Sequence, residues 1–559
     1  MSVLKKQWVI KNTDRKQSLL KKLLANRGLE SEVEMEQFFH PTAERDFHDP
    51  FLMKDMGKAV LRIGQAIEKG ERIMIFGDYD VDGVTGSAIL MRALRLFKAN
   101  VSYRLPHRIE DGYGLREKFI KEFAKLDVKL AITVDNGISC FNEVALANEL
   151  GIDVIISDHH TVPEKIPAAY AILHPKLPGC GYPFTELTGA GVALKLAQAL
   201  FERRLDSVEA REQATTGLLD LACMGTIADF GALTGENRYI VKEGLRMLEN
   251  TRWPGLSRLK DNAGCKGKIS TYDIGFLLGP RINAAGRISH SSHALRLLLA
   301  DDDSTHVLAD TLEKLNRKRQ KMMEELNELA DTMATEQLQN PIIILHHPEF
   351  HGGIIGLIAA KMVEKYSRPA IAMEERAESL IGSCRTTASV NIIEALSSAK
   401  DLLSHFGGHA GAAGFDLPKK NLQAFKERLM LTVGKATNAE SCLPKLAIEC
   451  EISHEEVSQQ SMEMLRWFEP FGAGNDAPRF LLSGVPLHDY RTVGADKKHL
   501  KLTTRLNGEK VDAIGFKLGS FVSQLNGSKT LDLVCEIDEN EWQGKKSVQL
   551  KIADFRVAE

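Results

Sequence analysis

Short apolar runs and amphipathic stretches alternate along residues 55–160. The apolar runs are rich in isoleucine and valine and lie at 72–76, 101–105, 129–134 and 153–157. Helical patterns lie between them, for example at 85–99 and 143–151. Strands that are apolar on both faces and alternate with helices are typical of a parallel sheet covered on both sides. This region is therefore predicted to be a doubly wound α/β domain, in which ligands bind at the carboxyl ends of the strands.

The chain beyond this region changes its pattern twice. Residues 305–338 are predicted to form one long polar helix, which is either a connector or an ordinary surface helix of the first domain. After it, a strand at 342–345, a helix near 355–366 and a strand at 369–373 predict a second, smaller α/β domain. That domain ends in a glycine-rich stretch at 406–415.

From about residue 445 onward, polar and apolar residues alternate with a period of two. Asn-Gly at 507–508 and 526–527, and Gln-Gly at 543–544, interrupt this alternation. Turn dipeptides between alternating stretches predict hairpins, and therefore a small β-barrel or sandwich.

These patterns divide the chain into five predicted parts. They are an N-terminal helical segment, the doubly wound domain, a connecting helix, the smaller α/β domain and the β-rich domain. Their predicted limits are 1–45, 46–300, 301–340, 341–440 and 441–559. The chain has 559 residues, more than the roughly 250–300 that one hydrophobic core can serve, so several domains are expected.

The composition is that of a folded protein. Hydrophobic residues make up 43% of the chain and charged residues 26%, which excludes a disordered chain. The formal net charge is −3, so any nucleic-acid binding depends on local basic patches. The apolar runs are too short to span a membrane and the N-terminus has no signal-peptide pattern, so we expect a cytoplasmic protein without membrane contacts. The eight cysteines form no Cys-x-x-Cys pair and are expected to be reduced and buried.

Three aspartates follow the first apolar strand, in the sequence GDYDVDGVTG at 77–86. They are Asp78, Asp80 and Asp82. Carboxylates this close together repel one another, and a divalent cation relieves the repulsion. Oxygen ligands of this kind suit Mg²⁺ or Mn²⁺. The alternatives are a simple acidic turn and a calcium loop, but the twelfth position of such a loop would be Ile89 where glutamate is required.

Two further strands end in residues of the same kind. Asp135 follows the third apolar run, and Asp158, His159 and His160 follow the fourth. A single histidine is usually a structural residue. Acids and histidines after successive parallel strands, however, predict a common site at one edge of the sheet. The mixture of carboxylates and imidazoles favours Mn²⁺ and still permits Mg²⁺. Asp229, after an apolar helix, is a further candidate ligand.

Motifs along most of the chain resemble a known enzyme family. DYDVDG, VDNGIS, SDHH and GTIAD occur in the order found in the DHH phosphoesterase superfamily. The stretches HRIEDGYGL at 107–115, GPRINAAGRI at 279–288 and FGGHAGAAGF at 406–415 are similar to the bacterial RecJ family of single-stranded-DNA exonucleases. FEPFGAGNDAPRF at 468–480 resembles the start of that family's OB-fold. LHHPEFHGGIIGLIA at 345–359 departs mildly from the family pattern.

The resemblance implies a catalytic DHH domain, a DHHA1 domain, an OB-fold and a centre of two Mn²⁺ or Mg²⁺ ions. Asp80 and Asp82 would each hold one ion and Asp135 would bridge both. Asp158 would orient its neighbouring histidine, and His160 would face the scissile phosphate, so that His160, Asp158 and Asp135 are the expected catalytic residues. The expected metal ligands are Asp78, Asp80, Asp82, Asp135, His159 and Asp229.

The resemblance also implies a set of substrate-binding residues. Arginine suits this task because its planar guanidinium matches phosphate oxygens. Ser383 and Arg385 would bind the 5′ end, and His409 would line the floor of the second domain. The full expected set is Arg108, Arg281, Asn283, Arg287, Ser383, Arg385 and His409.

The activity implied by the resemblance is metal-dependent 5′→3′ hydrolysis of single-stranded DNA to mononucleotides in recombination and repair. The implied partners are a single-stranded-DNA-binding protein and a helicase, and the protein is expected to be a monomer. Two alternatives remain at this point. One is a DHH enzyme acting on short oligonucleotides, cyclic dinucleotides or pyrophosphate, and the other is a DNA-binding scaffold without catalysis.

Overall fold

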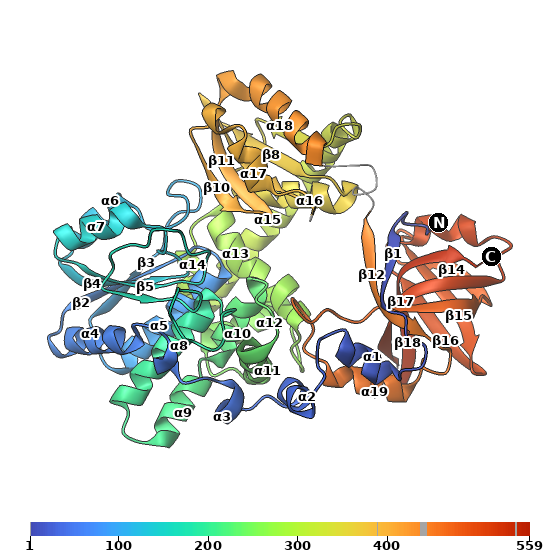
Figure 1. Cartoon of the computed structure of the whole chain (residues 1–559), viewed down its shortest axis with the longest axis horizontal. Coiled ribbons are helices and arrows are strands. Elements are labelled where there is room, and N and C mark those ends of the chain that lie inside the picture. Colours follow the sequence, from blue (N-terminus) through green and yellow to red (C-terminus); the bar gives the residue numbers. More distant parts are fainter. Residues whose placement is uncertain (1, 388, 437–443, 543–544, 559) are drawn as a thin grey trace. The chain divides into compact units, whose positions relative to one another are not determined.

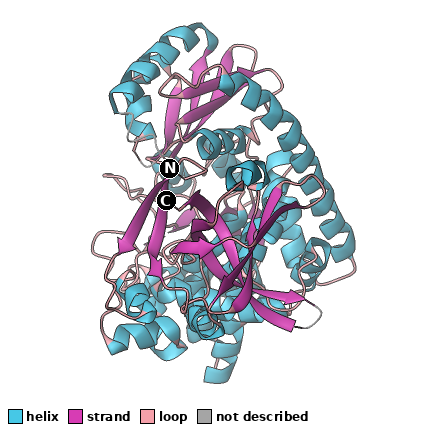
Figure 2. Ribbon diagram, turned by 90° about the vertical axis from the view of Figure 1, so that its right-hand side faces the viewer, coloured by secondary structure: helices cyan, strands magenta, loops and turns pink. Residues whose placement is uncertain are grey.

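A computed structural model describes the chain except residues 1, 388, 437–443, 543–544 and 559 (Figure 1). The chain forms two compact units. The terminal unit comprises Met1–His40, Asn438–Phe471 and Asn475–Glu559. The central unit comprises Pro41–Thr437 and Gly472–Gly474. Figure 2 distinguishes their helices and strands by colour. Among the described residues, no helix has both the length and the apolar character needed to cross a membrane.

The central unit contains the predicted parallel sheet. Its strand order is β3-β2-β4-β5-β6, and each neighbouring pair is parallel. The strands are β2 (Arg72–Gly77), β3 (Val101–Arg104), β4 (Val128–Val134), β5 (Asp153–Ser157) and β6 (Ala171–Leu173). From β2 the chain crosses to β3 on one side, whereas β4, β5 and β6 continue on the other side. The carboxyl ends of β2 and β4 therefore flank a topological switch point, where open α/β sheets bind their ligands.

The strands of this sheet are buried on both faces, as their continuous apolar runs predict. In β2 and β4, every residue but one is buried. The helices between the strands are α5 (Val81–Leu96), α6 (Glu117–Lys125) and α7 (Phe141–Glu149). Helix α4 (Met56–Glu68) precedes β2, and α8 (Gly189–Arg204) follows β6 and packs on α5.

A helical region follows the sheet and was predicted only in outline. It contains α9 (Val208–Thr216), α10 (Leu219–Ala228), α11 (Gly235–Glu249), α12 (Pro254–Ala263), the π-helix η2 (Asp273–Leu278), α13 (Gly279–Ile288) and α14 (Ser292–Leu299). The long helix α15 (Ser304–Thr335) comes next. Its early residues, such as Leu312, belong to the core of the first sheet, and its late residues, such as Leu326, belong to a second core. This helix therefore connects two hydrophobic cores.

The second sheet of the central unit has the order β10-β11-β9-β8-β7, and only β7 and β8 are parallel. Its strands are β7 (Ile343–His347), β8 (Ala370–Glu375), β9 (Ser379–Arg385), β10 (His405–His409) and β11 (Ala412–Pro418). The accompanying helices are α16 (Ile355–Tyr366), α17 (Ile392–Ser397) and α18 (Leu422–Ala436).

The terminal unit is built on an eight-stranded sheet of order β1-β12-β13-β17-β18-β16-β15-β14. The strands are β1 (Gln7–Asn12), β12 (Lys445–Ile452), β13 (Phe480–Pro486), β14 (Asp489–Val493), β15 (His499–Leu506), β16 (Glu509–Gly515), β17 (Thr530–Trp542) and β18 (Lys545–Val557). Helices α1 (Leu19–Ala25), α2 (Glu32–Phe39) and α19 (Gln459–Trp467) accompany them. The Asn-Gly pair at 507–508 forms the predicted hairpin turn, with both residues at positive φ. The Gln-Gly pair at 543–544 lies outside the described residues.

The N-terminal segment, expected to be helical, contains α1 and α2 but also supplies the strand β1, which was not predicted. This strand pairs in parallel with β12. Trp8 and Ile10, two residues apart, share one face of β1 and pack against Leu446 and Ile448. The Trp8 indole N–H also donates to the carboxylate of the buried Asp554 at 2.9 Å. The alternation of burial extends over only the six residues of β1 and is flanked by charged residues, so the sequence pattern did not reveal this strand.

The described cysteines are buried, as predicted. There are seven of them, and they form no disulfide with one another. Cys442 lies outside the described residues.

Candidate metal centre

The first acidic motif spans the junction between β2 and α5. Asp78 lies just beyond β2, and its backbone N–H donates to the carbonyl of Val134 at 3.1 Å. The Asp80 side chain caps α5 by accepting hydrogen bonds from the backbone N–H groups of Asp82 and Gly83. Asp82 therefore lies in the first helical turn, and only Asp78 and Asp80 precede the helix. Gly83 permits the turn, because a Cβ there would lie 2.6 Å from the backbone of Asp78.

Asp82 is buried and is held by the start of α8. Its carboxylate accepts hydrogen bonds from the Thr188 hydroxyl at 3.0 Å and from the backbone N–H groups of Gly189 and Ala190 at 2.6 and 2.9 Å. A helix N-terminus favours a negative charge. Even so, burial and the neighbouring Asp80 raise the pKa of Asp82 to about 7. This anchor of Asp82 was not predicted from the sequence.

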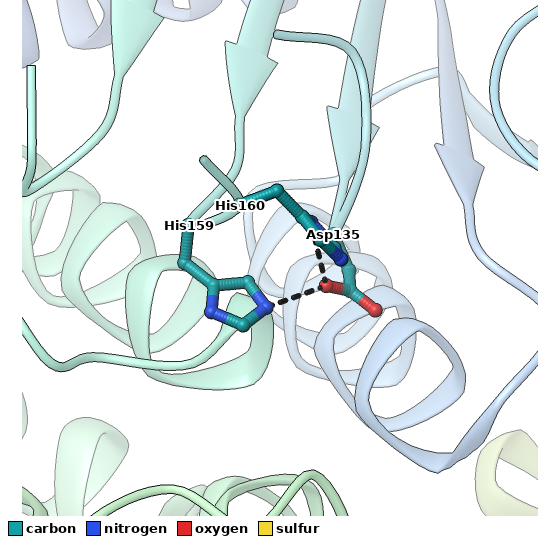
Figure 3. Close-up of side chains that lie close together, drawn as sticks. All are labelled: Asp135, His159 and His160. Carbon is teal, nitrogen blue, oxygen red and sulfur yellow. Dashed lines mark ion pairs between the residues drawn. The ribbon is translucent and has the colours of Figure 1, made fainter. Parts of the chain in front are cut away.

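Asp135 follows β4 and lies opposite the first motif. It has a positive φ of 63°, a conformation that non-glycine residues rarely adopt and that is often found at functional sites. Its Oδ1 lies 3.1 Å from Nε2 of His159 and 3.8 Å from Nδ1 of His160 (Figure 3). His159 Nε2 also lies 3.5 Å from Oδ2 of Asp229, at the end of α10. Residues from β4, β5 and α10 thus converge on one point.

The six predicted metal ligands fall into two groups with ligand atoms within 4.8 Å of one another. One group is Asp78, Asp80 and Asp135, and the other is Asp82, His159 and Asp229. Asp135 also forms a third such group with His159 and His160, so it lies between the two. Each of the two groups would hold one divalent cation if metal bound here, and Asp135 would be within reach of both.

Burial and mutual repulsion of the acids in these groups outweigh the effect of the nearby cations, Arg108 and His160. Burial and the neighbouring acids raise the pKa values of Asp78 and Asp135 well above their usual range, and raise that of Asp229 to about 8. Burial and the nearby His160 lower the pKa of His159 to about 3, which leaves its imidazole neutral. Oδ1 of Asp78, Oδ1 of Asp135 and Nε2 of His159 are buried without a hydrogen bond to a described residue. Ionised carboxylates and a neutral imidazole with free lone pairs fit divalent cations.

Asp158 and His160 form a separate, well-satisfied pair. Nδ1 of His160 lies 2.7 Å from Oδ1 of Asp158, and the buried Asp158 also accepts from the backbone N–H groups of Ile138, His159 and His160. Burial opposes both charges, but the pair holds the pKa of Asp158 at about 2 and that of His160 at about 9. The aspartate therefore orients the side chain of His160, whereas the expectation was that it would orient the neighbouring metal-ligating histidine, His159.

Several arginines form a basic cluster near these residues. Burial and the neighbouring Arg108, Arg319 and Arg385 lower the pKa of Arg287 to about 9. Arg385 donates to the hydroxyl of Ser383 at 3.2 Å. No salt bridge among the described residues joins these four arginines to an acid, although Arg108 lies near the Asp78 carboxylate, and this excess of positive charge favours an anionic ligand.

The remaining predicted substrate-binding residues lie in different surroundings, and not all of them have side chains free to bind a substrate. His409 of β10 stacks on His160, with ring centroids 6.1 Å apart and an interplanar angle of 12°. Oδ1 of Asn283 is buried and has no hydrogen bond to a described residue. Arg281, in contrast, is paired with Glu313 of α15 at 2.8 Å and donates to the Leu277 carbonyl. Two of its three guanidinium nitrogens thus donate within the protein, which argues against its expected role as a phosphate clamp.

Comparison with known proteins agrees with this geometry. Residues 72–226 match the family described as "DHH family, N-terminal domain", residues 324–435 match "DHHA1 domain" and residues 448–554 match "RecJ OB domain". The single-stranded-DNA-specific exonuclease RecJ of Bacillus subtilis is 37% identical over 97% of this chain and 68% of its own length. The corresponding protein of Escherichia coli is 32% identical over 96% of this chain and 95% of its own length. The chain belongs to the RecJ family.

Solved structures of RecJ proteins have the same fold. The RecJ of Thermus thermophilus in complex with Mn²⁺ superposes with a TM-score of 0.83 at 30% identity, over 99% of this chain and 80% of the other. An exonuclease RecJ bound to manganese gives a TM-score of 0.61 at 36% identity, over 68% of this chain and 95% of the other. The predicted family and the predicted combination of DHH, DHHA1 and OB domains are therefore confirmed.

Two residues of this site were not predicted from the sequence. The Tyr113 hydroxyl donates to the Asp135 carbonyl at 3.0 Å and lies 3.1 Å from Nδ1 of His160. His174 is buried, accepts a hydrogen bond from the backbone N–H of Lys176 and contacts the His160 carbonyl at 2.8 Å through Nε2. Tyr113 lies within a motif that was recognised, and His174 directly follows β6. Extending the strand-end rule to β6 would have found His174.

Proposed function

We propose that the chain is a metal-dependent exonuclease that degrades single-stranded DNA from its 5′ end to mononucleotides, in DNA recombination and repair. The observation that carries the proposal is the pair of ligand groups around Asp135 at the switch point of the sheet. Membership of a family whose curated members are named single-stranded-DNA-specific exonucleases supports the substrate.

Two Mn²⁺ or Mg²⁺ ions are the proposed cofactors, because RecJ of Thermus thermophilus has been solved with either ion and the residues here fit such cations. Asp78 and Asp80 would hold one ion, Asp82, His159 and Asp229 the other, and Asp135 both. When bound, such ions activate a water molecule and stabilise the attacking and leaving oxygens of the phosphodiester.

His160 has a task that needs no metal. With a pKa of about 9, it is an imidazolium at neutral pH. Asp158 fixes Nδ1, so Nε2–H remains to donate to an oxygen of the scissile phosphate. Tyr113 and His409 flank the ring and limit its rotation. His160 therefore stabilises charge on the phosphate, while Asp158 acts as a positioning residue.

The 5′→3′ direction is proposed to come from the basic cluster. A terminal 5′-phosphate carries more negative charge than an internal phosphodiester. Ser383 and Arg385 of β9, together with Arg108 and Arg287, offer the donors for it. Asn283, on the same helix as Arg287, is proposed to contact the neighbouring nucleotide. Arg281 is not part of this proposal, because Glu313 already pairs with it.

The cellular setting is proposed from the family resemblance. We infer a cytoplasmic monomer that works with a single-stranded-DNA-binding protein and a helicase, which would expose the strand to be degraded. Sedimentation of the purified chain tests the monomer. Co-purification with each partner, with and without nuclease treatment, tests the two interactions.

Digestion of single strands labelled at either end tests the function. With Mn²⁺ or Mg²⁺, a 5′-labelled strand should release labelled mononucleotide at once, whereas a 3′-labelled strand should shorten progressively. EDTA should stop both reactions. Equal turnover of a dinucleotide and a long strand would instead indicate a small-substrate enzyme, and metal-independent binding without cleavage would indicate a scaffold.

A further inference from the structure

The chain leaves the parallel sheet of the central unit at the end of β6. β5 and β6 pair in parallel, and the backbone N–H of Asp158 donates to the Leu173 carbonyl at 3.1 Å. The ladder cannot continue through Pro175, because proline has no N–H. The next contact between the two strand ends is made by a side chain, since Nε2 of His174 lies 2.8 Å from the carbonyl oxygen of His160.

Both ring nitrogens of His174 are used within the protein. Nδ1 accepts a hydrogen bond from the backbone N–H of Lys176 at 3.1 Å, so this nitrogen carries no proton. The proton therefore lies on Nε2, which donates to the His160 carbonyl. The residue is fully buried, and burial lowers the pKa of His174, which favours its neutral form. His174 is thus a neutral imidazole in one fixed tautomer, with no nitrogen left for a metal ion or a substrate.

His160 is held from two directions. Oδ1 of Asp158, just after β5, lies 2.7 Å from Nδ1 of the His160 ring and also accepts from the His160 backbone N–H at 3.2 Å. His174, just after β6, donates to the carbonyl of the same residue. Asp158 therefore fixes the ring and the amide side of His160, whereas His174 fixes the carbonyl side. Together the two contacts determine where the backbone places the His160 ring.

The position of this ring is important because one donor has to reach the phosphate. Asp158 occupies Nδ1, so Nε2–H is the donor that remains for an oxygen of the scissile phosphate. A displacement of about 1 Å at a reacting group can lower a rate by roughly a hundredfold, even when the substitution lies away from the reacting atoms. A residue that holds the backbone of His160 can therefore affect the rate without touching the substrate.

We propose that His174 is a positioning residue of the nuclease site, which holds the His160 carbonyl and thereby places the His160 imidazolium against the scissile phosphate. This role rests on the proposed function, because His174 acts only through His160. His174 is not a catalytic residue, since both of its nitrogens are occupied within the protein.

Two substitutions separate the two hydrogen bonds of His174. The amide nitrogen of glutamine reaches about as far as Nε2 of histidine, so His174→Gln keeps a donor for the His160 carbonyl. Asparagine is shorter, so His174→Asn keeps an acceptor for the Lys176 N–H and has no donor near His160. His174→Asn should lower kcat for a 5′-phosphorylated strand by about ten- to hundredfold and leave KM unchanged. His174→Gln should restore kcat to near the wild-type value.

A histidine of the terminal unit provides a matched control. Nε2 of His454 makes the same kind of contact, with the Ser483 carbonyl at 3.1 Å. His454→Asn should leave kcat unchanged. Uptake of Mn²⁺ by His174→Asn should equal that of the wild-type chain, because His174 has no nitrogen free to bind a metal ion.

Hydrogen–deuterium exchange of the metal-free protein gives a readout that does not depend on activity. Amides of residues 158–161 should exchange faster in His174→Asn than in the wild-type chain or in His174→Gln, whereas those of β2 should be unchanged. The measurement also separates the two proposals. A wild-type chain that cleaves no DNA would refute the nuclease function, and exchange would still show whether His174 holds the backbone of His160.

Three outcomes would overturn the role of His174. The first is unchanged kcat or unchanged exchange at residues 158–161 in His174→Asn. The second is equal slowing by both substitutions, which would give the ring a general packing role. The third is a raised KM with unchanged kcat, which would make His174 part of DNA binding. If His174→Asn failed to fold, a folded but slow His174→Gln would still contradict the proposal, and a folded, fast His174→Gln would support it.

Discussion

The central unit contains two buried clusters of charged residues that differ in their partners. In one, the chain supplies a counter-ion or a hydrogen bond to every charge, whereas in the other several polar atoms have no such partner. In the first cluster, Lys195 and Glu236 are both fully buried with Nζ and Oε1 2.9 Å apart, and the Tyr182 hydroxyl donates to the other carboxylate oxygen at 2.7 Å. Lys195 also donates to the His48 carbonyl and lies over the ring of Phe47. Each charge there has a partner of opposite sign or a hydrogen bond.

The metal centre is completed only in part, because Asp80 and Asp82 accept hydrogen bonds whereas other ligand atoms have none. Its acids face one another, and polar atoms of Asp78, Asp135 and His159 are buried without a hydrogen bond to a described residue. A structural cluster is complete within the chain, whereas a binding site leaves groups for a ligand. Polar atoms without partners, rather than burial or charge alone, therefore distinguish the metal centre from the structural cluster of Lys195 and Glu236.

Asp135→Asn tests the metal centre in this comparison and has the largest expected effect. Loss of the shared ligand should lower the cleavage rate by at least about a thousandfold, or roughly 4 kcal/mol of barrier. Thermal stability without metal should rise, because one of several mutually repelling charges is gone. Asp127→Asn is the control, since Asp127 is an exposed acid at the other end of β4. A rate above about a tenth of wild type would contradict the shared-ligand role.

Glu236→Gln tests the satisfied cluster. It leaves the Lys195 charge buried without its counter-ion, which should cost about 3–5 kcal/mol of unfolding free energy in urea titrations. The cleavage rate per folded molecule should not change. Glu243→Gln removes the partner of an exposed arginine on the same helix and should cost less than about 1 kcal/mol. If the two variants were equally stable, the buried pair would have no structural role.

Arg385→Ala addresses the ligand expected at the basic cluster. Loss of a charge-assisted hydrogen bond of about 1.5–3 kcal/mol should erase a ten- to hundredfold preference for 5′-phosphate over 5′-hydroxyl strands. Cleavage rates on matched strands measure this preference. Arg376→Ala, at an arginine paired with Glu374, is the control. Equal slowing on both strands would make Arg385 a general backbone contact.

The pH dependence of metal binding gives the smallest effect. Asp82 and Asp229 have pKa values raised to about 7 and about 8. The metal-free folded state therefore keeps these protons to a higher pH than the unfolded state does. Their contribution to stability is present below about pH 4 and is lost as the pH rises through these values. Mn²⁺ must displace the protons, so its thermal stabilisation should be greater at about pH 8 than at about pH 6. The opposite trend in a thermal shift assay would mean that these acids are not ligands.

The sequence predicted those features that depend on short-range patterns. Continuous apolar runs located β2 to β5, and the strand-end rule brought Asp135 and His159 to the same edge as Asp78. The paired positive φ values at 507–508 follow from the Asn-Gly sequence. The family motifs added the roles of individual residues.

The missed features depend on contacts between distant parts of the chain. β1 joins a strand more than four hundred residues later, at Lys445–Ile452, and no local pattern encodes that pairing. Asp82 accepts a hydrogen bond from Thr188 at the start of α8, and Arg281 forms an ion pair with Glu313 of α15. A motif identifies the residue type but not the partner that packing brings to it.

Electron paramagnetic resonance during Mn²⁺ titration tests the two-ion centre most directly. The account predicts that wild-type protein takes up two Mn²⁺ ions per chain with an exchange-coupled signal, since Asp135 would join the two groups. Asp135→Asn should lose the coupling. Binding of a single ion by the wild-type chain, or of two ions whose spectra remain uncoupled, would contradict it.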